Sequence, residues 1–171
     1  MVLLYGGGHH RTPYTWDKER VSSYIRYVDT DNQSHWLFDS FLFLEIMDTG
    51  TGGANKMFAK GYNLESANQA DWTKLIDYYF QSETGIGALD ASVKEASAIL
   101  GTPRQKRQIV ISIPEPIVYQ HPEQASSSTK YWAKIDNQTL DFSNSADRIK
   151  ACKWYIDQVR AKFNEKNYQH V

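Results

Sequence analysis

Residues 35–47, HWLFDSFLFLEIM, form the most apolar stretch of the chain. Turn-forming sequences bound the stretch on both sides, DTDNQS before it and DTGTGG after it, and its length and composition favour a core strand over a helix. Because the apolar residues are nearly continuous rather than alternating, we expect both faces of this strand to be covered. Such strands belong to parallel sheets, and this limits the folds open to the chain.

Two other apolar runs predict buried strands. Residues 2–5 are followed by three glycines, and residues 109–113 are β-branched and followed by Pro114. The segment 16–29 has mixed signals, because its apolar spacing favours a helix while its central sequence YIRYV is equally typical of a strand. We favour the helix here. Residues 119–144 are expected to form a long loop, with a short hairpin around 132–142.

Three helices are predicted from apolar stripes at three- and four-residue spacing. The first carries a capping-box pattern of Ser66 and Gln69, and the second ends at Gly101, where a left-handed cap is expected, ahead of Pro103. The third begins at about Ala146. The stripes are Trp72, Leu75, Ile76, Tyr79 and Phe80; Ile86, Leu89, Val93, Ala96 and Leu100; and Ile149, Cys152, Ile156, Val159 and Phe163.

The alternation of strands and helices predicts an α/β fold with a parallel sheet and covering helices. An open sheet and part of a (β/α) barrel both fit the pattern. A closed barrel needs eight strands and roughly 250 residues, and only about three strands are visible in this chain of 171 residues. We therefore expect a single domain over residues 1–171 that is a partial (β/α)-barrel-like unit.

Composition excludes several classes of protein. The 19 Lys and Arg residues nearly balance 20 Asp and Glu residues, for a net charge of −1, whereas nucleic-acid-binding proteins usually carry a clustered basic excess. No apolar run approaches the length of a membrane span. Cys152 is the only cysteine, so neither an internal disulfide nor a cysteine-rich zinc site is possible. Its place on an apolar helix face predicts an inert core thiol.

Ligands of parallel α/β folds bind beyond the carboxyl ends of the strands, which directs attention to three carboxylates. Glu115 follows the strand at 109–113 and is fixed between Pro114 and Pro116. Asp39 and Glu45 are six residues apart, so in one regular strand they share a face. Rigidly placed carboxylates suit acid–base catalysis. We therefore take Glu115, Glu45 and Asp39 as candidate catalytic residues, although structural pairing is the commoner role for a residue such as Asp39.

The glycine-rich segment after the first strand supplies candidate binding residues, His9, His10 and Arg11. Adjacent histidines rarely ligate one metal ion, and the chain lacks metal-site and phosphate-loop spacings, so we expect neither a metal nor a cofactor. Trp16 and Trp132 fall near predicted loops, where their rings could stack on sugars or instead cover the core. Three other tryptophans are expected to be core residues: Trp36, Trp72 and Trp154.

A set of short segments runs from end to end of the chain: YGG at 5–7, WLFDSFLFLE at 36–45, DW at 71–72, ALD at 88–90, IPEP at 113–116, and DRI and WYID within 147–157. The order of these segments gives the chain a resemblance to the domain of unknown function family DUF4855. The resemblance implies a longer protein that continues into another apolar strand, and a context of secreted, extracytoplasmic proteins of glycan-degrading bacteria. Some barrel glycosidases carry Asn-Glu-Pro at a strand end. Here Pro114 replaces the Asn, so the catalytic role is not transferred on that basis.

Three hypotheses follow for the function. The first is a glycoside-hydrolase-like enzyme in the longer parent protein, in which Glu115 acts with Glu45 or Asp39 and the present chain alone is inactive. The second is a non-catalytic glycan-binding module. The third is a structural fragment without activity, whose apolar surfaces are covered by the missing part of the barrel or by self-association. The expected partner under the first two hypotheses is a glycan.

Overall fold

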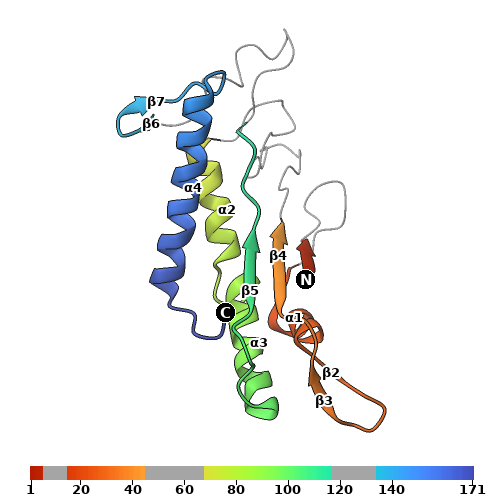
Figure 1. The fold of residues 1–171 in the computed structure, drawn as a ribbon. Helices are drawn as coiled ribbons and strands as arrows, with labels where there is room; N and C mark the ends of the chain where they lie inside the picture. Colours follow the sequence, from red (N-terminus) through yellow and green to blue (C-terminus); the bar gives the residue numbers. More distant parts are fainter. Residues whose placement is uncertain (6–14, 45–67, 117–133) are drawn as a thin grey trace.

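The computed structural model describes residues 1–5, 15–44, 68–116 and 134–171 (Figure 1). These residues form a mixed α/β fold. Its elements in chain order are β1 (Val2–Tyr5), α1 (Lys18–Ile25), β2 (Arg26–Val28), β3 (Ser34–Trp36), β4 (Ser40–Leu44), α2 (Gln69–Tyr79), α3 (Gly85–Leu100), β5 (Gln108–Ile111), β6 (Lys134–Ile135), β7 (Gln138–Thr139) and α4 (Ser145–Lys166).

Strands β1, β4 and β5 form a parallel sheet in that order, which confirms the parallel sheet predicted from the sequence. The register places Phe41 of β4 between Val2 of β1 and Ile109 of β5. Two antiparallel hairpins, β2–β3 and β6–β7, lie outside this sheet. In the second hairpin the turn residues Asp136 and Asn137 have φ angles of 52° and 62°, as a two-residue turn of type I′ requires.

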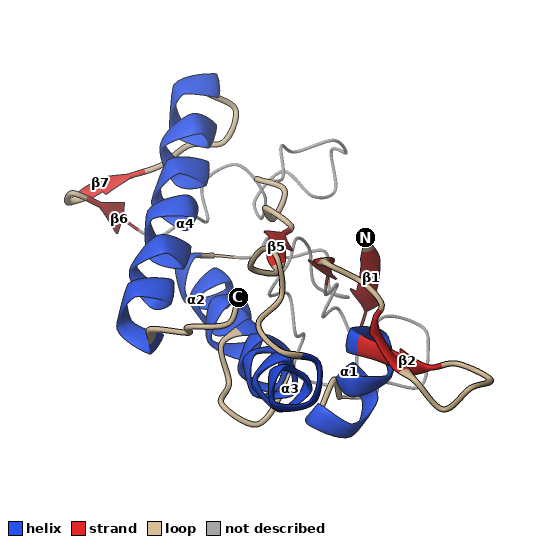
Figure 2. Ribbon diagram, turned by 60° about the horizontal axis from the view of Figure 1, so that its bottom comes forward, coloured by secondary structure: helices blue, strands red, loops and turns tan. Residues whose placement is uncertain are grey.

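The hydrophobic core lies between one face of the parallel sheet and the helices. Leu4, Phe41 and Phe43 point from the sheet into a single cluster that all four described helices join. Trp72 of α2 is fully buried in this cluster, with its ring 5.8 Å from that of Tyr155 in α4. Figure 2 shows the helices in an arc around the same side of the sheet. The described sheet is thus covered by helices on one face.

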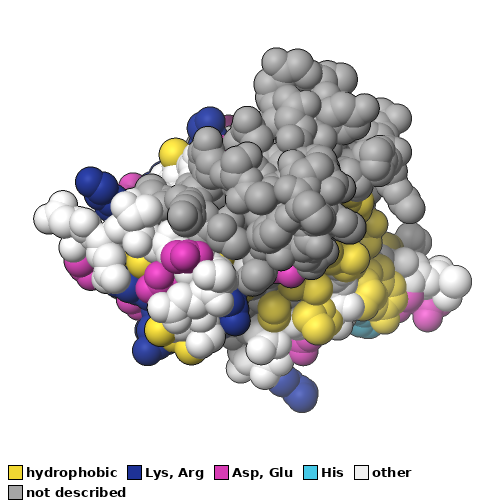
Figure 3. Space-filling view, turned by 90° about the horizontal axis from the view of Figure 1, so that it is seen from above, with side chains coloured by type: hydrophobic (Ala, Val, Ile, Leu, Met, Phe, Trp, Pro, Cys, Tyr) yellow, Lys and Arg dark blue, Asp and Glu magenta, His cyan; other side chains and the backbone are white. Residues whose placement is uncertain are grey.

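The opposite face of the sheet carries a row of apolar side chains. Successive residues of a strand point to opposite faces, and Leu3, Leu42 and Val110 are aligned across the three strands. None of them belongs to the core cluster, and Leu3 is 50% exposed. In the view of Figure 3, hydrophobic side chains gather on the side of the molecule that holds β1 and the β2–β3 hairpin. No described helix covers this row.

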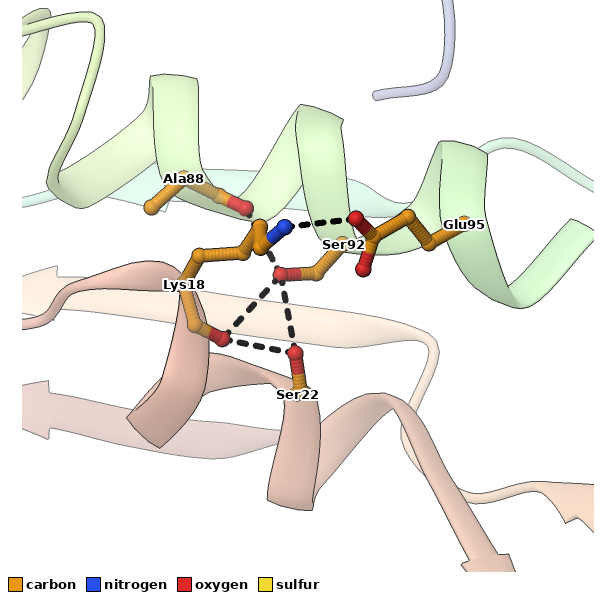
Figure 4. Close-up of polar contacts among 5 residues, drawn as sticks. All are labelled: Lys18, Ser22, Ala88, Ser92 and Glu95. Carbon is orange, nitrogen blue, oxygen red and sulfur yellow. Dashed lines mark hydrogen bonds and ion pairs between the residues drawn. The ribbon is translucent and has the colours of Figure 1, made fainter.

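Helices α1 and α3 are joined by polar contacts (Figure 4). The buried Ser92 of α3 donates its hydroxyl to Ala88 O at 2.8 Å, and the Ser22 hydroxyl of α1 donates to Lys18 O at 2.6 Å and lies 3.3 Å from that of Ser92. At the rim of this contact Lys18 Nζ lies 2.5 Å from the Glu95 carboxylate. Small side chains with satisfied hydroxyls allow the two helices to pack closely.

Three sequence expectations need correction. The apolar stretch 35–47 is not one strand, because it contributes β3 to a hairpin, breaks at residues 37–39, and only then enters the sheet as β4. The ambiguous segment 16–29 contains both predicted structures, a short helix and then strand β2. Helix α2 is capped by Asn68 and Asp71, which form a reciprocal capping box, rather than by the predicted pair. Of that pair, Ser66 lies outside the described residues.

The C-terminal cap of α3 and the buried face of α4 also differ from expectation. Gly101 has the predicted positive φ, 75°, but its ψ of 174° is not that of a left-handed helical cap. Helix α4 begins at Ser145, and its buried residues are Ala151 and Tyr155, whereas Ile149 of the predicted stripe is 56% exposed. Within the described part of the chain, no helix is long and apolar enough to cross a membrane.

Candidate functional site

The three parallel strands all begin at one end of the sheet and all finish at the other. We call the end at Tyr5, Leu44 and Ile111 the carboxyl edge, and the end at Val2, Ser40 and Gln108 the amino edge. Because the three strands are parallel, the segments that follow β1, β4 and β5 all leave from the carboxyl edge, where ligands of parallel α/β folds bind.

Glu115 lies beyond the carboxyl edge. The Ser112 amide donates to Phe43 O at 3.2 Å, so the pairing with β4 continues one residue past β5. Pro114 is then buried, Glu115 is exposed and Pro116 is half-buried. Among the described residues, no hydrogen bond or ion pair occupies the Glu115 carboxylate. Glu115 is thus held between two prolines, whose φ angles are restricted, and Pro114 is anchored by its burial. The carboxylate of Glu115 is therefore available to a ligand from solvent.

Asp39 lies at the amino edge, directly ahead of β4 and not inside a strand as predicted. Its backbone carbonyl accepts from the Gln108 amide at 2.8 Å, and its carboxylate accepts from Gln105 Nε2 at 3.0 Å. The exposed side chain is therefore held by a structural partner. Since Asp39 and Glu115 are at opposite edges of the sheet, they do not form the acid–base pair considered from the sequence.

Trp16 is a core residue. Only 9% of its surface is exposed, its ring packs edge-on against Tyr24 at 5.7 Å, and its carbonyl accepts from the Gly85 amide at 2.9 Å. So little of the ring is accessible that the predicted stacking on a sugar is not possible in this arrangement. The core predictions for Trp72, which is fully buried, and for Trp36 and Trp154, which are half-buried against the core, are confirmed.

The remaining candidate residues lie outside the described residues. They are Glu45, His9, His10, Arg11 and Trp132, and their predicted roles stay predictions. Within the ranges that the structure describes, no group of three or more His, Cys, Asp or Glu side chains could hold a metal ion. Cys152 is half-buried, and burial raises the pKa of its thiol, which lowers its fraction of reactive thiolate.

Arg107 is a polar residue that sequence reasoning missed. Although charged, it is only 5% exposed, and its guanidinium lies 4.4 Å from the centre of the Trp36 ring. Nη1 donates to Gln105 O at 3.3 Å, and Nε is buried without a partner among the described residues. Burial lowers the pKa of Arg107, an effect that the nearby charge of Asp39 partly opposes. The sequence shows a basic turn at 104–107, but local pattern does not reveal which of its cations is buried.

Arg107 lines a hollow of about 520 Å³ at the amino edge. We call it the amino-edge hollow. Its lining residues are Trp36, Leu37, Phe38, Asp39, Pro103, Arg104, Gln105 and Arg107. The two segments that form it, 36–39 and 103–107, precede β4 and β5, and the hydrogen bond from the Gln108 amide to Asp39 O holds them together.

Comparison with known proteins gives one match. The model of a family described as Domain of unknown function (DUF4855) matches residues 1–171, the whole chain. No curated protein and no solved structure matches the chain.

Proposed function

The chain belongs to the DUF4855 family, and we propose that it forms part of a (β/α)-barrel-like domain of a carbohydrate-active protein, with Glu115 as an acidic residue of its site. The family match covers the whole chain but assigns no reaction, so the proposal depends on the arrangement of the sheet and on the chemistry at its carboxyl edge.

The order of the strands supports the barrel-like part of the proposal. In a doubly wound sheet the strand order reverses and helices cover both faces. Here the spatial order β1, β4, β5 is also the chain order, and the described helices pack on one face. The other face carries the row of Leu3, Leu42 and Val110. Layers of branched apolar side chains fill the interior of a (β/α) barrel, and this row has the composition of such a layer.

The observation that carries the functional part is the position of Glu115 at the carboxyl edge. It is exposed between a buried and a half-buried proline, without a partner in the described structure. A polysaccharide offers hydroxyl groups to such a carboxylate. In a hydrolase, the protonated form of the same group can donate to the leaving oxygen, which requires a fixed position rather than a flexible side chain.

A glycoside hydrolase needs a second carboxylate near the first. Separations of about 5–5.5 Å favour retention and about 6.5–9.5 Å inversion. Glu45 follows β4 directly in the sequence and is our candidate for this second group. The described residues place no second carboxylate beside Glu115, and Asp39 is at the other edge. The second candidate function is a glycan-binding module in which the exposed Glu115 only accepts hydrogen bonds from sugar hydroxyls.

The two functions are separated by measuring turnover and binding with the same variants. The full-length parent protein is incubated with a panel of polysaccharides, new reducing ends are assayed, and binding is followed by affinity electrophoresis. Glu115→Gln and Glu45→Gln are the test variants, and Glu83→Gln, which changes an exposed residue between α2 and α3, is the matched control.

Loss of turnover in Glu115→Gln with binding retained supports the hydrolase. Binding without turnover that weakens in Glu115→Gln supports the binding module. The proposal is overturned if no polysaccharide is bound or cleaved, or if Glu115→Gln behaves like Glu83→Gln in both assays.

A further inference from the structure

We propose that the amino-edge hollow is a binding site for a carboxylate-bearing sugar, that is, a uronic acid residue of an acidic saccharide. The carboxylate part of this inference stands on the hollow alone. The saccharide part rests on the proposed function and goes beyond it, because it adds a second site to a carbohydrate-active protein.

Arg107 provides the anion-binding group. The residue is buried, yet the described residues satisfy Nη1 only through a 3.3 Å bond and leave Nε without an acceptor. A buried charge that lacks full hydrogen bonding is costly. A carboxylate matches the planar fork of a guanidinium with two parallel hydrogen bonds, so a bound carboxylate would relieve this cost.

The charge of the lining also favours an anion. Two cations, Arg104 and Arg107, face one carboxylate, Asp39, which gives the hollow a net charge of +1 when these three groups are counted. Arg104 is exposed and can move towards a ligand, whereas Arg107 is fixed by its stacking on Trp36. A mobile cation beside a fixed one can close on an anion that the fixed one has positioned.

The size and walls of the hollow fit a sugar ring better than a bare ion. About 520 Å³ lies within the range of small-molecule sites, roughly 300–1,000 Å³. Leu37 and Phe38 offer apolar surface to the C–H face of a ring, while Asp39 and Gln105 can accept hydrogen bonds from its hydroxyls. An acidic peptide would meet the Asp39 charge without supplying hydroxyls, so the mixed polarity favours a ligand that carries both a carboxylate and hydroxyl groups.

The test compares ligands that differ in one group. Binding of a glucuronate- or galacturonate-containing disaccharide is measured by calorimetry against the neutral disaccharide in which the carboxylate is reduced to an alcohol, and against acetate. The variants are Arg104→Gln and Arg107→Gln, with Arg107→Lys as the conservative change. Arg160→Gln, which alters an exposed arginine of α4 (75% exposed side chain), is the control. Thermal unfolding shows whether Arg107→Gln still folds, and the exposed Arg104 provides a test that does not depend on it.

We expect the uronate to bind and the neutral analogue to bind at least ~10-fold more weakly, since a charge-assisted hydrogen bond contributes that much or more. Arg104→Gln and Arg107→Gln should weaken uronate binding by ~10-fold or more, Arg107→Lys should restore only part of it, and Arg160→Gln should leave it unchanged. Equal binding of the neutral analogue, or unchanged uronate binding in Arg104→Gln and in folded Arg107→Gln, would overturn the site.

The outcomes also separate this inference from the proposed function. If acetate binds as tightly as the uronate, the carboxylate site stands and the saccharide part is wrong. Uronate binding that depends on Arg104 and is unaffected by Glu115→Gln supports the amino-edge hollow even if no polysaccharide is processed at Glu115. Uronate binding lost in Glu115→Gln but not in Arg104→Gln assigns the ligand to the carboxyl edge and refutes the hollow.

Discussion

Replacing Gly87 with alanine is expected to destabilise the protein, although alanine is the better helix former. The residue lies in the first turn of α3, where the change gains about 1 kcal/mol of helix propensity. A Cβ atom at this position would lie 2.4 Å from Gln81 O and 2.5 Å from Ser82 O. Both contacts are with backbone atoms, so the connection from α2 must shift. Overpacking of this kind costs about 1–3 kcal/mol, and with two such contacts we expect a net loss of ~2 kcal/mol.

Two other glycines separate the steric term from backbone strain. At Gly85, φ is +56° and a Cβ would lie 2.7 Å from Tyr79 O, so alanine adds left-handed strain to a clash, for a loss of ~3 kcal/mol. At Gly101, φ is +75° but nothing lies within 4 Å of the added atom. The cost there is backbone strain alone, about 1–3 kcal/mol, because a φ of 75° with a ψ of 174° is a conformation that glycine almost alone adopts.

The free energies of unfolding of the three variants are measured by urea unfolding, followed by far-ultraviolet circular dichroism. Equal m-values show that the unfolded states of the variants are comparable. Gly85→Ala is expected to lose more stability than Gly87→Ala, because it adds backbone strain to the clash. A Gly87→Ala variant as stable as the parent would show that propensity outweighs the contact with the two carbonyls and would refute the reasoning.

The pKa of Asp29 is lowered from 3.8, first by the Gln33 amide and then by His35. A lowered folded-state pKa means that this carboxylate stabilises the β2–β3 turn above its unfolded pKa and ceases to do so as the pH falls through the folded value. The Gln33 amide resonance should therefore titrate in acid, and should not in Asp29→Asn; a flat profile in the parent protein contradicts the contact. Tyr155→Phe removes a buried hydroxyl that has no partner among the described residues and keeps the ring against Trp72. The urea midpoint of this variant should therefore equal or exceed that of the parent. A decrease of more than ~1 kcal/mol in the free energy of unfolding would reveal a hydrogen bond to that hydroxyl.

The parts of the fold that the sequence predicts correctly are those determined by local pattern. The β-branched run of β5 and the apolar stripes of α2 and α3 depend on residues within one element. The errors arise where distant residues decide the outcome. Residues 35 and 36 leave the expected strand because β3 pairs with β2 across a turn, with Tyr27 opposite His35. No short-range pattern distinguishes this pairing from continuation of the strand into the sheet.

For the candidate site, as for the fold, the sequence predicts what depends on local pattern and misses what depends on distant residues. The rule of carboxyl strand ends led to Glu115, whose position depends only on β5 and its two prolines. The same rule failed for Asp39, because the break between β3 and β4 places this residue at the start of a strand rather than inside it. Arg107 could not be selected at all, since its burial depends on Trp36, 71 residues away in the sequence.

The two edges of the sheet carry groups that should act independently. Strand β4 has five residues, so at ~3.3 Å per residue the amino and carboxyl edges are separated by about 13–17 Å. This exceeds the Debye length of ~8 Å at physiological ionic strength, so an anion bound in the solvent-open amino-edge hollow has little direct electrostatic effect at the carboxyl edge. Communication between the edges would instead have to pass through the packed strands. If the effects of the Arg104 and Glu115 variants on the free energy of ligand binding are not additive, the sheet itself must be displaced when a ligand binds. Additive effects would identify two separate sites.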